Sequence, residues 1–497
     1  MEPHSATTVA ASNWDPRPKE TRMTFAGLAS DSREIKPGYL FAALPGTRDD
    51  GGAFLAEAVG RGAVAVLGEP RLRATAEALG VRFIADENPR RRLALFAAEH
   101  FVAQPKTVAA ITGTNGKTSV SVFLRQIWQS LGHRAASMGT IGLVGPEETQ
   151  SLRHTTPDAI ALHRLLAELE HDGVDHLALE ASSHGLDQFR LDGVRIAAAG
   201  FTNITHDHLD YHGDFARYLA AKLRLFRELA MDGGVAVVNA DAGRAAHFLE
   251  AARARSLHLV TVGERGTDLH LVAREPSPDS QRLEIEYRNR RYPVILPLAG
   301  SFQASNALVA AGLAIGLGDS ADGVFSALHR LKGAPGRLEK VAYAASGAPI
   351  YVDYAHTPDA LETVLTALRP HVQNRLRLVF GCGGDRDKAK RPVMGAIAAR
   401  LADAAIVTDD NPRSEDPAEI RRAILACSPG AREIGDRGQA IRAGIAALQP
   451  GDVLVIAGKG HESGQTAGSE TRPFLDADEA IKAAIAEGGC AAAEGNA

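Results

Sequence analysis

The chain has 497 residues, of which 45% are hydrophobic, and a formal net charge of −5 at pH 7. This length exceeds one ordinary hydrophobic core, so we expect about three domains. The slightly acidic balance gives no electrostatic argument for nucleic acid or a membrane surface as a partner, and we expect neither. The three cysteines are far apart and form no disulfide framework, which is typical of reduced thiols in a cytoplasmic protein.

Two breaks divide the chain into predicted domains. One lies at residues 102–105, ahead of a strand-like run, and the other is the Gly/Pro cluster at 333–336. The predicted domains are therefore 1–104, 105–334 and 335–497. The first contains polar groups such as Ser30 and Ser32, but the residues alone assign it no ligand.

The most informative stretch begins where the apolar run 108–111 ends. A glycine-rich turn between a strand and a helix directs backbone N–H groups and the positive end of the helix dipole at a phosphate. Ile111 stands where the usual pattern has its first glycine, so we interpret the stretch as a variant P-loop that turns at Gly113. Its members are Gly113, Thr114, Asn115, Gly116, Lys117, Thr118 and Ser119. The alternative, a turn without a ligand, leaves Lys117 and Thr118 at the phosphate and Mg²⁺ positions unexplained.

Strand-like runs alternate with helix-like stretches in both later domains, which predicts an α/β fold with two doubly wound sheets in tandem. The runs are 108–111, 175–179, 197–201, 235–238 and 257–262 in the central domain, and 350–352, 376–380, 404–407 and 453–456 in the third. Polar, glycine-containing motifs follow nearly every run. Because ligands of open α/β sheets bind at the carboxyl ends of the strands, we expect two such edges to face a substrate cleft.

Glu180 and His208 follow consecutive runs and are candidates to bind Mg²⁺ beside the phosphates. The histidine-rich segment 206–212 permits two other interpretations, a zinc hydrolase cluster and a purely structural histidine cluster. The zinc pattern is broken because Tyr211 separates Asp210 from His212.

Three basic residues are ambiguous on their own. Lys222 has the context of an ordinary solvated helix lysine. Arg386 and Arg413 follow strand-like runs and suit an anion-binding edge, although pairing with neighbouring aspartates on the surface is the alternative. The segment 381–388 lacks the last glycine of a dinucleotide fingerprint, so it favours an anion over NAD.

Taken together, these motifs resemble the Mur ligase family over nearly the whole chain, and within it the members that add diaminopimelate. The segments that carry the resemblance are 113–118, 155–157, 180–186, 203–210, Lys222 with 225–226, 300–306, 336–339, 353–358, 410–413 and 458–462. The resemblance implies an N-terminal domain that binds a UDP-sugar, a central ATPase domain and a C-terminal Rossmann-like domain that binds an amino acid.

The activity that the resemblance implies is ATP-dependent amide synthesis through an acyl phosphate. Diaminopimelate is joined to UDP-N-acetylmuramoyl-L-alanyl-D-glutamate, a peptidoglycan precursor. Lys117, Lys222 and His208 match catalytic positions, while Thr118 or Ser119, Glu180, His208 and a carbamate on Lys222 match those that serve Mg²⁺. The positions that match ATP contacts beyond the loop are Asn306, Arg337, Asp353 and His356.

The same resemblance implies the remaining substrate contacts. Ser30 and Ser32 match the uridine side, and the muramoyl-dipeptide contacts are Thr155, Thr156, Ser182, Gln188 and Arg190. The diaminopimelate contacts are Arg386, Asp410, Asn411, Pro412, Arg413, Gly458 and Glu462. The run Asp-Asn-Pro-Arg at 410–413 resembles the diaminopimelate signature rather than the lysine type, with Arg386 and Arg413 clamping the distal carboxylate.

We expect a monomer whose partners are these small molecules. The alternatives are a lysine-adding ligase, a folylpolyglutamate synthase-like ligase and the ligase that adds D-Ala-D-Ala. Outside that superfamily stand an ATP-sensing switch and the zinc hydrolase.

Overall fold

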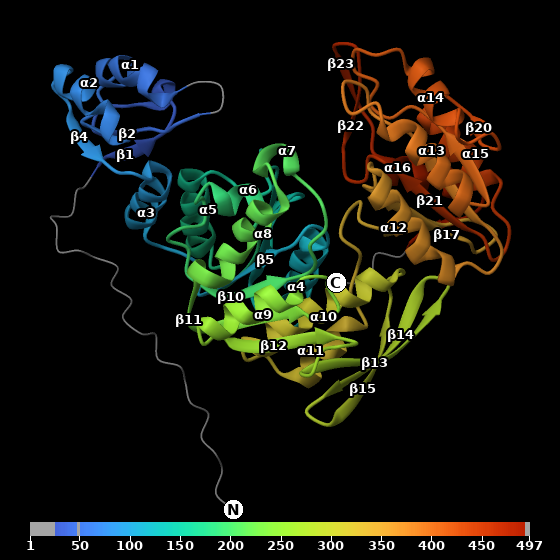
Figure 1. Cartoon of the computed structure of the whole chain (residues 1–497). Helices are drawn as coiled ribbons and strands as arrows, with labels where there is room; N and C mark the ends of the chain where they lie inside the picture. The colour runs from blue at the N-terminus through green and yellow to red at the C-terminus, as the bar shows by residue number, and fades with distance from the viewer. Residues whose placement is uncertain (1–24, 47–49, 493–497) are drawn as a thin grey trace, which may run out of the picture. The chain divides into compact units, whose positions relative to one another are not determined.

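A computed structural model of the chain describes residues 25–46 and 50–492. The described residues divide into two compact units, with the division between Phe96 and Ala97 (Figure 1). Parts of the predicted first and third domains, residues 1–24, 47–49 and 493–497, lie outside the described residues. Among the helices described, none combines the length and apolar composition needed to cross a membrane.

The first unit is built on a parallel sheet with strand order β1-β2-β3-β4. Its strands are β1 (Gly27–Ala29), β2 (Tyr39–Ala43), β3 (Ala65–Gly68) and β4 (Arg82–Ala85). The helices are α1 (Leu55–Gly60), α2 (Arg73–Ala78) and α3 (Pro89–Phe101), which contains the boundary between the units, with 3₁₀ turns at Ser32–Glu34, Gly51–Phe54 and Pro70–Leu72. Phe41, Leu55 and Val66 belong to the core between sheet and helices.

The second unit opens with an eleven-stranded sheet, in the order β15-β14-β13-β12-β11-β10-β5-β9-β6-β7-β8. The strands are β5 (Thr107–Thr112), β6 (Ala135–Gly139), β7 (Gly142–Val144), β8 (Thr149–Gln150), β9 (His176–Glu180), β10 (Ile196–Phe201), β11 (Ala230–Asn239), β12 (His258–Gly263), β13 (Leu269–Ser277), β14 (Ser280–Tyr287) and β15 (Arg290–Leu296). All five strand-like runs predicted in this region are confirmed. The antiparallel strands β13 to β15 were not predicted; Arg288 and Asn289, both left-handed, make the tight turn between the last two.

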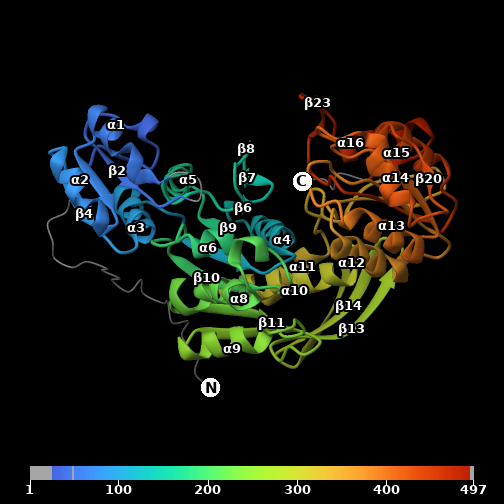
Figure 2. The ribbon, with the colours of Figure 1, turned by 45° about the horizontal axis from the view of Figure 1, so that its top comes forward.

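Helices cover both faces of the parallel part of this sheet (Figure 2). Buried residues of α4 (Lys117–Ser130), α10 (Ser301–Gly316) and α11 (Ala321–Leu328) pack with Ala109 and Ile111 of β5, whereas those of α5 (Ala159–His171), α6 (Ser183–Asp187), α8 (Phe215–Arg224) and α9 (Ala245–Ala254) pack with Val108 and Ala110. Successive strand residues face opposite sides, so an uninterrupted apolar run suits a strand buried on both faces. The remaining elements are α7 (Leu209–His212) and a π-helical turn at Leu225–Leu229.

The position of β5 determines where this sheet can bind a ligand. Strands β9 and β10 are consecutive along the chain, yet they pair with opposite sides of β5. The connections leaving the carboxyl end of β5 and its neighbours therefore diverge, which opens the crevice used by ligands of doubly wound sheets.

The C-terminal sheet has seven strands in the order β20-β19-β18-β21-β17-β16-β24. The strands are β16 (Glu339–Tyr343), β17 (Pro349–Asp353), β18 (Leu376–Phe380), β19 (Ala404–Val407), β20 (Arg432–Glu433), β21 (Val453–Ala457) and β24 (Cys490–Ala491). Its helices are α12 (Pro358–Leu368), α13 (Lys390–Leu401), α14 (Pro417–Leu425), α15 (Arg437–Ala446) and α16 (Asp476–Ala486), with a 3₁₀ turn at Arg369–His371. A separate hairpin consists of β22 (Gly464–Ala467) and β23 (Glu470–Pro473). The four predicted runs are confirmed as β17, β18, β19 and β21. The strand pairings of this sheet are parallel, except that β16 pairs antiparallel with β17 and β24.

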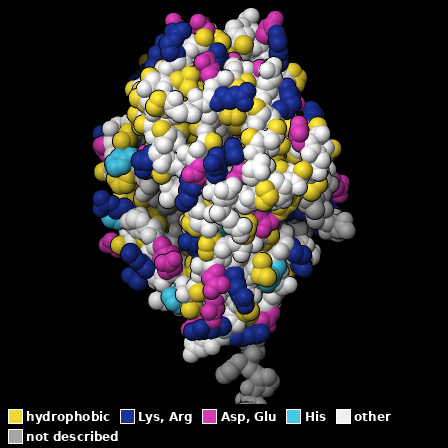
Figure 3. All heavy atoms as spheres, turned by 90° about the vertical axis from the view of Figure 1, so that its right-hand side faces the viewer, with side chains coloured by type: hydrophobic (Ala, Val, Ile, Leu, Met, Phe, Trp, Pro, Cys, Tyr) yellow, Lys and Arg dark blue, Asp and Glu magenta, His cyan; other side chains and the backbone are white. Residues whose placement is uncertain are grey.

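Ion pairs on the described surface are mostly exposed, such as Arg290 with Asp322 at 2.9 Å, and such pairs contribute little to stability. Basic and acidic side chains lie intermixed on the face shown in Figure 3. That face therefore presents no extended field of one sign.

Candidate active site

The predicted P-loop lies between β5, which ends at Thr112, and α4, which begins at Lys117. Side chains from the end of β10 hold it in place: Thr202 Oγ1 donates to Asn115 O at 2.6 Å, and Asn203 Oδ1 accepts from Asn115 N at 3.0 Å. Gly116 is left-handed (φ 86°), and a Cβ there would lie 2.3 Å from Asn306 Oδ1. Only glycine suits this approach of the loop to α10.

Lys117 and Lys222 both donate to the carbonyl oxygen of Gly113, at 2.9 and 2.7 Å. Burial lowers the pKa of both amines, and the charge of Lys117 lowers that of Lys222 further. The interpretation of Lys222 as a solvated lysine is wrong. The side chain is 1% exposed, because it lies on the inward face of α8, and its ammonium nitrogen is 4.6 Å from the Tyr218 ring centre.

Glu180 ends β9 and is fully buried. Its carboxylate accepts from Thr118 Oγ1 at 3.1 Å, Thr140 N at 2.8 Å and Thr140 Oγ1 at 3.2 Å. Among the described residues no lysine, arginine or histidine forms an ion pair with it. A buried carboxylate with only neutral donors is costly, so this donor set suits a cation.

His208 lies beside the P-loop, and its own backbone is left-handed (φ 53°). Burial lowers its pKa, and the charges of Lys117 and Lys222 contribute in the same direction. Its ring is 4.8 Å from that of His184, centre to centre. A neutral imidazole is the form that binds a metal ion.

The predicted muramoyl-dipeptide residues form one network next to Glu180. Thr156 Oγ1 donates to Glu180 O at 2.8 Å and lies 2.9 Å from Ser182 Oγ, while Arg190 Nη1 donates to Thr156 O at 2.6 Å. Gln188 Oε1 accepts from Arg190 Nη2 at 2.7 Å. Thr155 Oγ1 is 3.1 Å from Thr140 Oγ1, so this group adjoins the carboxylate site.

The predicted adenosine-side residues are connected from α10 to the C-terminal sheet. Asn306 Nδ2 donates to Gln303 Oε1 at 3.2 Å, and Gln303 Nε2 donates to Arg337 O at 2.9 Å. The guanidinium carbon of Arg337 lies 4.7 Å from the centre of the Tyr354 ring, and its buried Nε has no hydrogen-bond partner among the described residues.

Two further predicted ATP contacts lie after β17. Asp353 accepts from Leu338 N at 2.6 Å and from Ala355 N at 2.7 Å, and burial raises its pKa to about 6. His356 follows in the same loop, where its Nδ1 bonds Tyr354 O at 2.8 Å and its carbonyl oxygen accepts from Lys390 Nζ at 2.8 Å.

Most of the predicted diaminopimelate residues lie at the carboxyl ends of β19 and β21, whereas Arg386 follows β18. Asn411 Nδ2 donates to Glu462 Oε2 at 2.8 Å, and Asp410 Oδ1 accepts from Asn411 N at 2.6 Å. Arg413 Nη1 donates to Gly384 O at 2.8 Å. A Cβ at Gly384 would lie 1.9 Å from Pro412 O, so glycine allows the two loops to meet.

Neither Arg386 nor Arg413 forms an ion pair with a described residue, which argues against the alternative that they pair with neighbouring aspartates. The carboxylate of Asp385 instead accepts from Ser414 N at 3.1 Å and Ser414 Oγ at 2.6 Å. Arg386 Nη1 donates only to Asp385 O, at 3.2 Å. Among the described residues, both guanidinium groups therefore have carbonyl oxygens as their hydrogen-bond partners.

Behind this edge lies a fully buried ion pair. Arg437 Nε and Nη2 donate to the Asp476 carboxylate at 2.7 and 2.6 Å, and both side chains are 0% exposed. Arg437 also donates to Ala457 O at 3.1 Å and Asp409 O at 3.4 Å. It thereby holds the ends of both strands from which the predicted diaminopimelate residues extend.

Three family descriptions match the chain. These are the Mur ligase middle domain over residues 111–314, the Mur ligase glutamate ligase domain over 336–460, and the Mur ligase family catalytic domain over 24–101. The chain belongs to the Mur ligase family. The resemblance inferred from the motifs is thus confirmed at the level of the family.

Several relatives of this Mur ligase carry the name UDP-N-acetylmuramoyl-L-alanyl-D-glutamate--2,6-diaminopimelate ligase. The protein from Bradyrhizobium diazoefficiens is 56% identical over 94% of this chain and 96% of its own, and that from Caulobacter vibrioides is 53% identical over 94% and 97%. A solved structure of the same name is 34% identical, covers 95% of this chain and 97% of its own, and has a TM-score of 0.72. MurF from Thermotoga maritima in complex with ADP is 20% identical with a TM-score of 0.59, which shows the fold alone.

In this Mur ligase the histidine-rich segment does not form the zinc cluster considered above. In the part of the chain that the structure describes, the one group of metal-type ligands that converges is His133, Asp175 and His176. It lies where β9 begins, at the opposite end of that strand from Glu180. Residues 206–212 contribute nothing to it.

Ser30 and Ser32 belong to the first unit. Ser30 is exposed, whereas Ser32 is buried and donates through Oγ to Glu57 Oε2 at 2.8 Å. Their relation to the central site stays a prediction.

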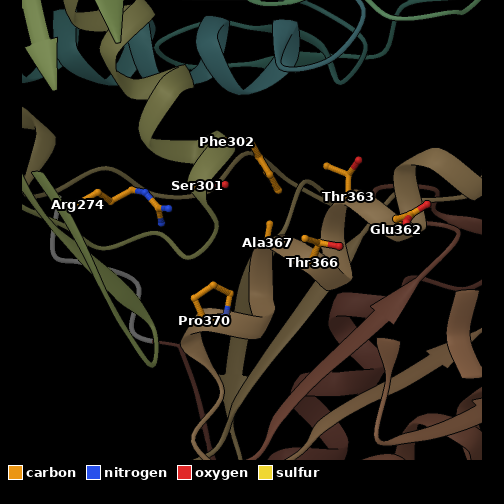
Figure 4. Close-up of a pocket in the computed structure, with 8 residues that line it drawn as sticks. All are labelled: Arg274, Ser301, Phe302, Glu362, Thr363, Thr366, Ala367 and Pro370. Atoms are coloured by element: carbon orange, nitrogen blue, oxygen red, sulfur yellow. The ribbon is translucent and has the colours of Figure 1, made fainter. Parts of the chain in front are cut away.

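A cavity of about 600 Å³ lies between β13, the start of α10 and α12, with Arg274, Phe302 and Thr363 among the lining residues (Figure 4). None of the predicted site residues lines it. The chemistry-bearing side chains gather at the strand edges instead, where we place the candidate site.

Sequence reasoning missed three side chains at these edges, namely Thr140, Tyr218 and Lys459. Thr140 follows β6 and bonds Glu180, so the rule that polar residues at strand ends form sites points to it. Tyr218 OH lies 2.9 Å from Thr114 Oγ1. Lys459 lies inside a motif that was recognised, but its burial is not readable from sequence.

Proposed function

We propose that this Mur ligase joins meso-2,6-diaminopimelate to the D-glutamyl carboxyl group of UDP-N-acetylmuramoyl-L-alanyl-D-glutamate, using ATP. The relatives named above carry this activity in their names. The observation that carries the choice of amino acid is the pair Arg386 and Arg413, whose guanidinium groups bond only carbonyl oxygens among the described residues.

The nucleotide side of the proposal rests on the P-loop. Backbone N–H groups at the start of α4 suit the phosphates, and Lys117, which is hydrogen-bonded to Gly113 O and Thr114 O, is proposed to reach the outer ones. Asn306, Arg337, Asp353 and His356 are proposed to contact adenosine and phosphate. The unpartnered Nε of Arg337 supports a polar ligand there.

The donor set around Glu180 fits Mg²⁺, since it combines a buried carboxylate with the Thr118 hydroxyl, and His208 lies within electrostatic reach of Lys117. Thr118 or Ser119, Glu180, His208 and a carbamate on Lys222 would hold it. When bound, Mg²⁺ supplies positive charge that neutralises the phosphate oxygens.

The carbamate is proposed because of the state of Lys222. Its amine is buried, has no carboxylate partner among the described residues, and has a pKa well below the usual range, so the neutral form is favoured. A neutral amine adds to the carbon of CO₂ and releases one proton, which leaves an anionic N–COO⁻ group. Such a group would turn a buried amine into an anionic metal ligand.

The chemistry then requires positioning by residues of this chain. A D-glutamyl carboxylate oxygen attacks the γ-phosphorus, the bond to the β-phosphate oxygen breaks, and ADP leaves with Lys117 compensating charge. Thr155, Thr156, Ser182, Gln188 and Arg190 are proposed to hold the muramoyl dipeptide next to Glu180. The neutral amine of diaminopimelate next attacks the acyl carbon, phosphate leaves, and the amine proton passes to solvent or phosphate.

Selection of the amine is proposed to occur in the C-terminal sheet. Arg386 and Arg413 would bind the distal carboxylate, and Gly458 and Glu462 the distal amino group, with Asp410, Asn411 and Pro412 shaping the site. A lysine substrate lacks that carboxylate and would leave both guanidinium groups uncompensated.

The domain roles follow from these assignments. Residues 1–104, with Ser30 and Ser32, are proposed to bind the UDP-sugar, 105–334 ATP, and 335–497 the amino acid. The substrates and product are soluble precursors of peptidoglycan, so we propose a cytoplasmic monomer in cell-wall synthesis.

The decisive experiment measures phosphate release by the full chain with Mg-ATP and UDP-N-acetylmuramoyl-L-Ala-D-Glu. Release that depends on meso-diaminopimelate, with little on L-lysine, supports the proposal. Release with lysine instead would contradict the arginine clamp, and release with neither amine would favour a folylpolyglutamate-type ligase or an ATP-sensing switch.

A further inference from the structure

Lys459 is a fully buried lysine that the proposed function does not use. It lies between Gly458 and Gly460, both with positive φ (119° and 54°), in the loop after β21. The side chain is 0% exposed, and a buried ammonium group needs partners for its three donors. Those partners are Gly464 O at 2.5 Å, Asn411 Oδ1 at 3.3 Å and Glu462 Oε2 at 3.4 Å.

The contact with Asn411 fixes the orientation of that amide. Asn411 Oδ1 accepts from both Lys459 Nζ and Thr466 N, the latter at 2.9 Å, while its Nδ2 donates to Glu462 Oε2. Turning the amide over would place two donors against Lys459 and Thr466 and an oxygen against the carboxylate. The network therefore permits one amide orientation.

Glu462 is anchored along one edge of its carboxylate only. Oε2 receives Asn411 Nδ2 at 2.8 Å and Lys459 Nζ at 3.4 Å, whereas Oε1 has no hydrogen-bond donor among the described residues. The side chain is 36% exposed. One oxygen is thus held by the protein, and the other has no donor among the described residues and is available to a ligand.

We infer that Lys459 is a positioning residue for the amino-acid substrate: it sets the Glu462 carboxylate and the Asn411 amide in the orientation that receives the distal ammonium group. Because solvent does not reach Lys459, it acts through these two side chains and not by touching substrate. A side chain that contacts the substrate loses less conformational freedom on binding when other hydrogen bonds already hold it in place. This inference rests on the proposed function of Glu462.

The test replaces Lys459 by methionine, which fills similar space without charge or donors. KM for meso-diaminopimelate should rise about 10- to 100-fold, the effect of losing hydrogen bonds to a charged group. At saturating diaminopimelate kcat should change less than about threefold, and KM for ATP should stay within about twofold.

Arg377→Met is the matched control. Arg377 is another mostly buried cation of the same sheet, at the start of β18, and it donates to the buried Asp452 at 2.7 Å. Its loss should lower the thermal midpoint without a selective rise in KM for diaminopimelate. An equal rise in both variants would show a general structural effect and overturn the inference.

A double-mutant cycle separates positioning from stability. If Lys459 acts through Glu462, then K459M should add less than about twofold to the KM of a Glu462→Gln enzyme. Multiplicative effects would overturn the inference.

A crystal structure of the wild-type enzyme with meso-diaminopimelate tests the same point even if the variants do not fold. The Lys459–Glu462 and Asn411–Glu462 contacts should persist with an amino group on Oε1, and a carboxylate that swings away from Lys459 would overturn the inference. The proposed function fails separately, if the wild-type enzyme does not use meso-diaminopimelate.

Discussion

The two strand edges that carry the predicted site residues differ in how their charged groups are satisfied. At the carboxyl ends of β5 and β9, Glu180 meets only hydroxyl and amide donors, and two lysines share one carbonyl oxygen. At the ends of β19 and β21, Asn411, Lys459 and Glu462 bond one another directly.

This contrast suggests two ways to build a substrate site. Under the proposed function, the first edge would hold its charges for phosphates and cations, so its electrostatics would depend on what binds. The Asn411–Lys459–Glu462 network of the second edge is already formed without substrate, which would favour discrimination between similar amino acids. Substitutions at the first edge should therefore affect turnover, and substitutions at the second should affect selectivity.

The largest effect is expected for Lys117→Ala at the first edge. Because Lys117 would neutralise the transferring phosphate, its loss should reduce phosphate release about 1,000-fold or more. Lys106→Ala, an exposed lysine just before β5, is the control. Activity of the K117A enzyme near the wild-type level would contradict the P-loop assignment.

Lys222→Ala should lower turnover about 100- to 1,000-fold, since it removes the proposed anionic ligand. Formate or acetate should restore part of the activity if a carbamate is present. K117A offers a matched lysine that bonds the same carbonyl, and the same anions should not restore it. Equal behaviour of both variants in the phosphate-release assay would count against the carbamate.

At the second edge, Arg413→Ala should reduce the preference for meso-diaminopimelate over L-lysine about 10- to 100-fold, with KM for ATP within about twofold. The ratio of kcat/KM for the two amines is the measurement. Arg422→Ala, an exposed residue of α14, should leave the ratio unchanged. An R413A enzyme with wild-type selectivity would remove the clamp from the mechanism.

A smaller, pH-dependent effect is expected at Asp353, whose pKa burial raises to about 6. As pH falls through this value the carboxylate gains a proton, so KM for ATP should rise several-fold between about pH 7 and 5. Asp353→Asn should show a raised KM that varies little with pH. A wild-type KM for ATP that is flat over this range would contradict the assignment.

The same shift predicts a stability effect of known sign. The folded-state pKa exceeds the unfolded value of 3.8, so this group favours folding below that value and the benefit is lost as pH rises through about 6. The thermal midpoint of D353N relative to wild type should therefore increase from about pH 4 to 6.

The strands and turns that position the site were predictable because they depend on the pattern of apolar and glycine residues within short stretches of the sequence. Apolar runs such as 108–111 become strands buried on both faces, and the turn at Gly113 leads into a helix as expected. The motifs also indicated which residues share an edge, since carboxyl ends of parallel strands meet there.

The features that were predicted wrongly or missed depend on tertiary packing. Lys222 has a helical context like that of many surface lysines, and only the packing of α8 against the sheet buries it. The strands β13 to β15 alternate exposed and buried residues, a weaker signal than an apolar run. The partners of Lys459 lie as far as Asn411, 48 positions away, so spacing along the chain could not reveal them.

The ion pair between Arg437 and Asp476 has a consequence for how this sequence can change over time. Replacing either partner alone would leave the other as an unpaired buried charge, which would lower the free energy of unfolding by about 3–5 kcal/mol. Replacing both partners by apolar residues can be nearly neutral for folding. A double replacement would still release Ala457 O and Asp409 O, which Arg437 holds. Natural variation at these two positions should therefore be rare, and it should be correlated when it occurs.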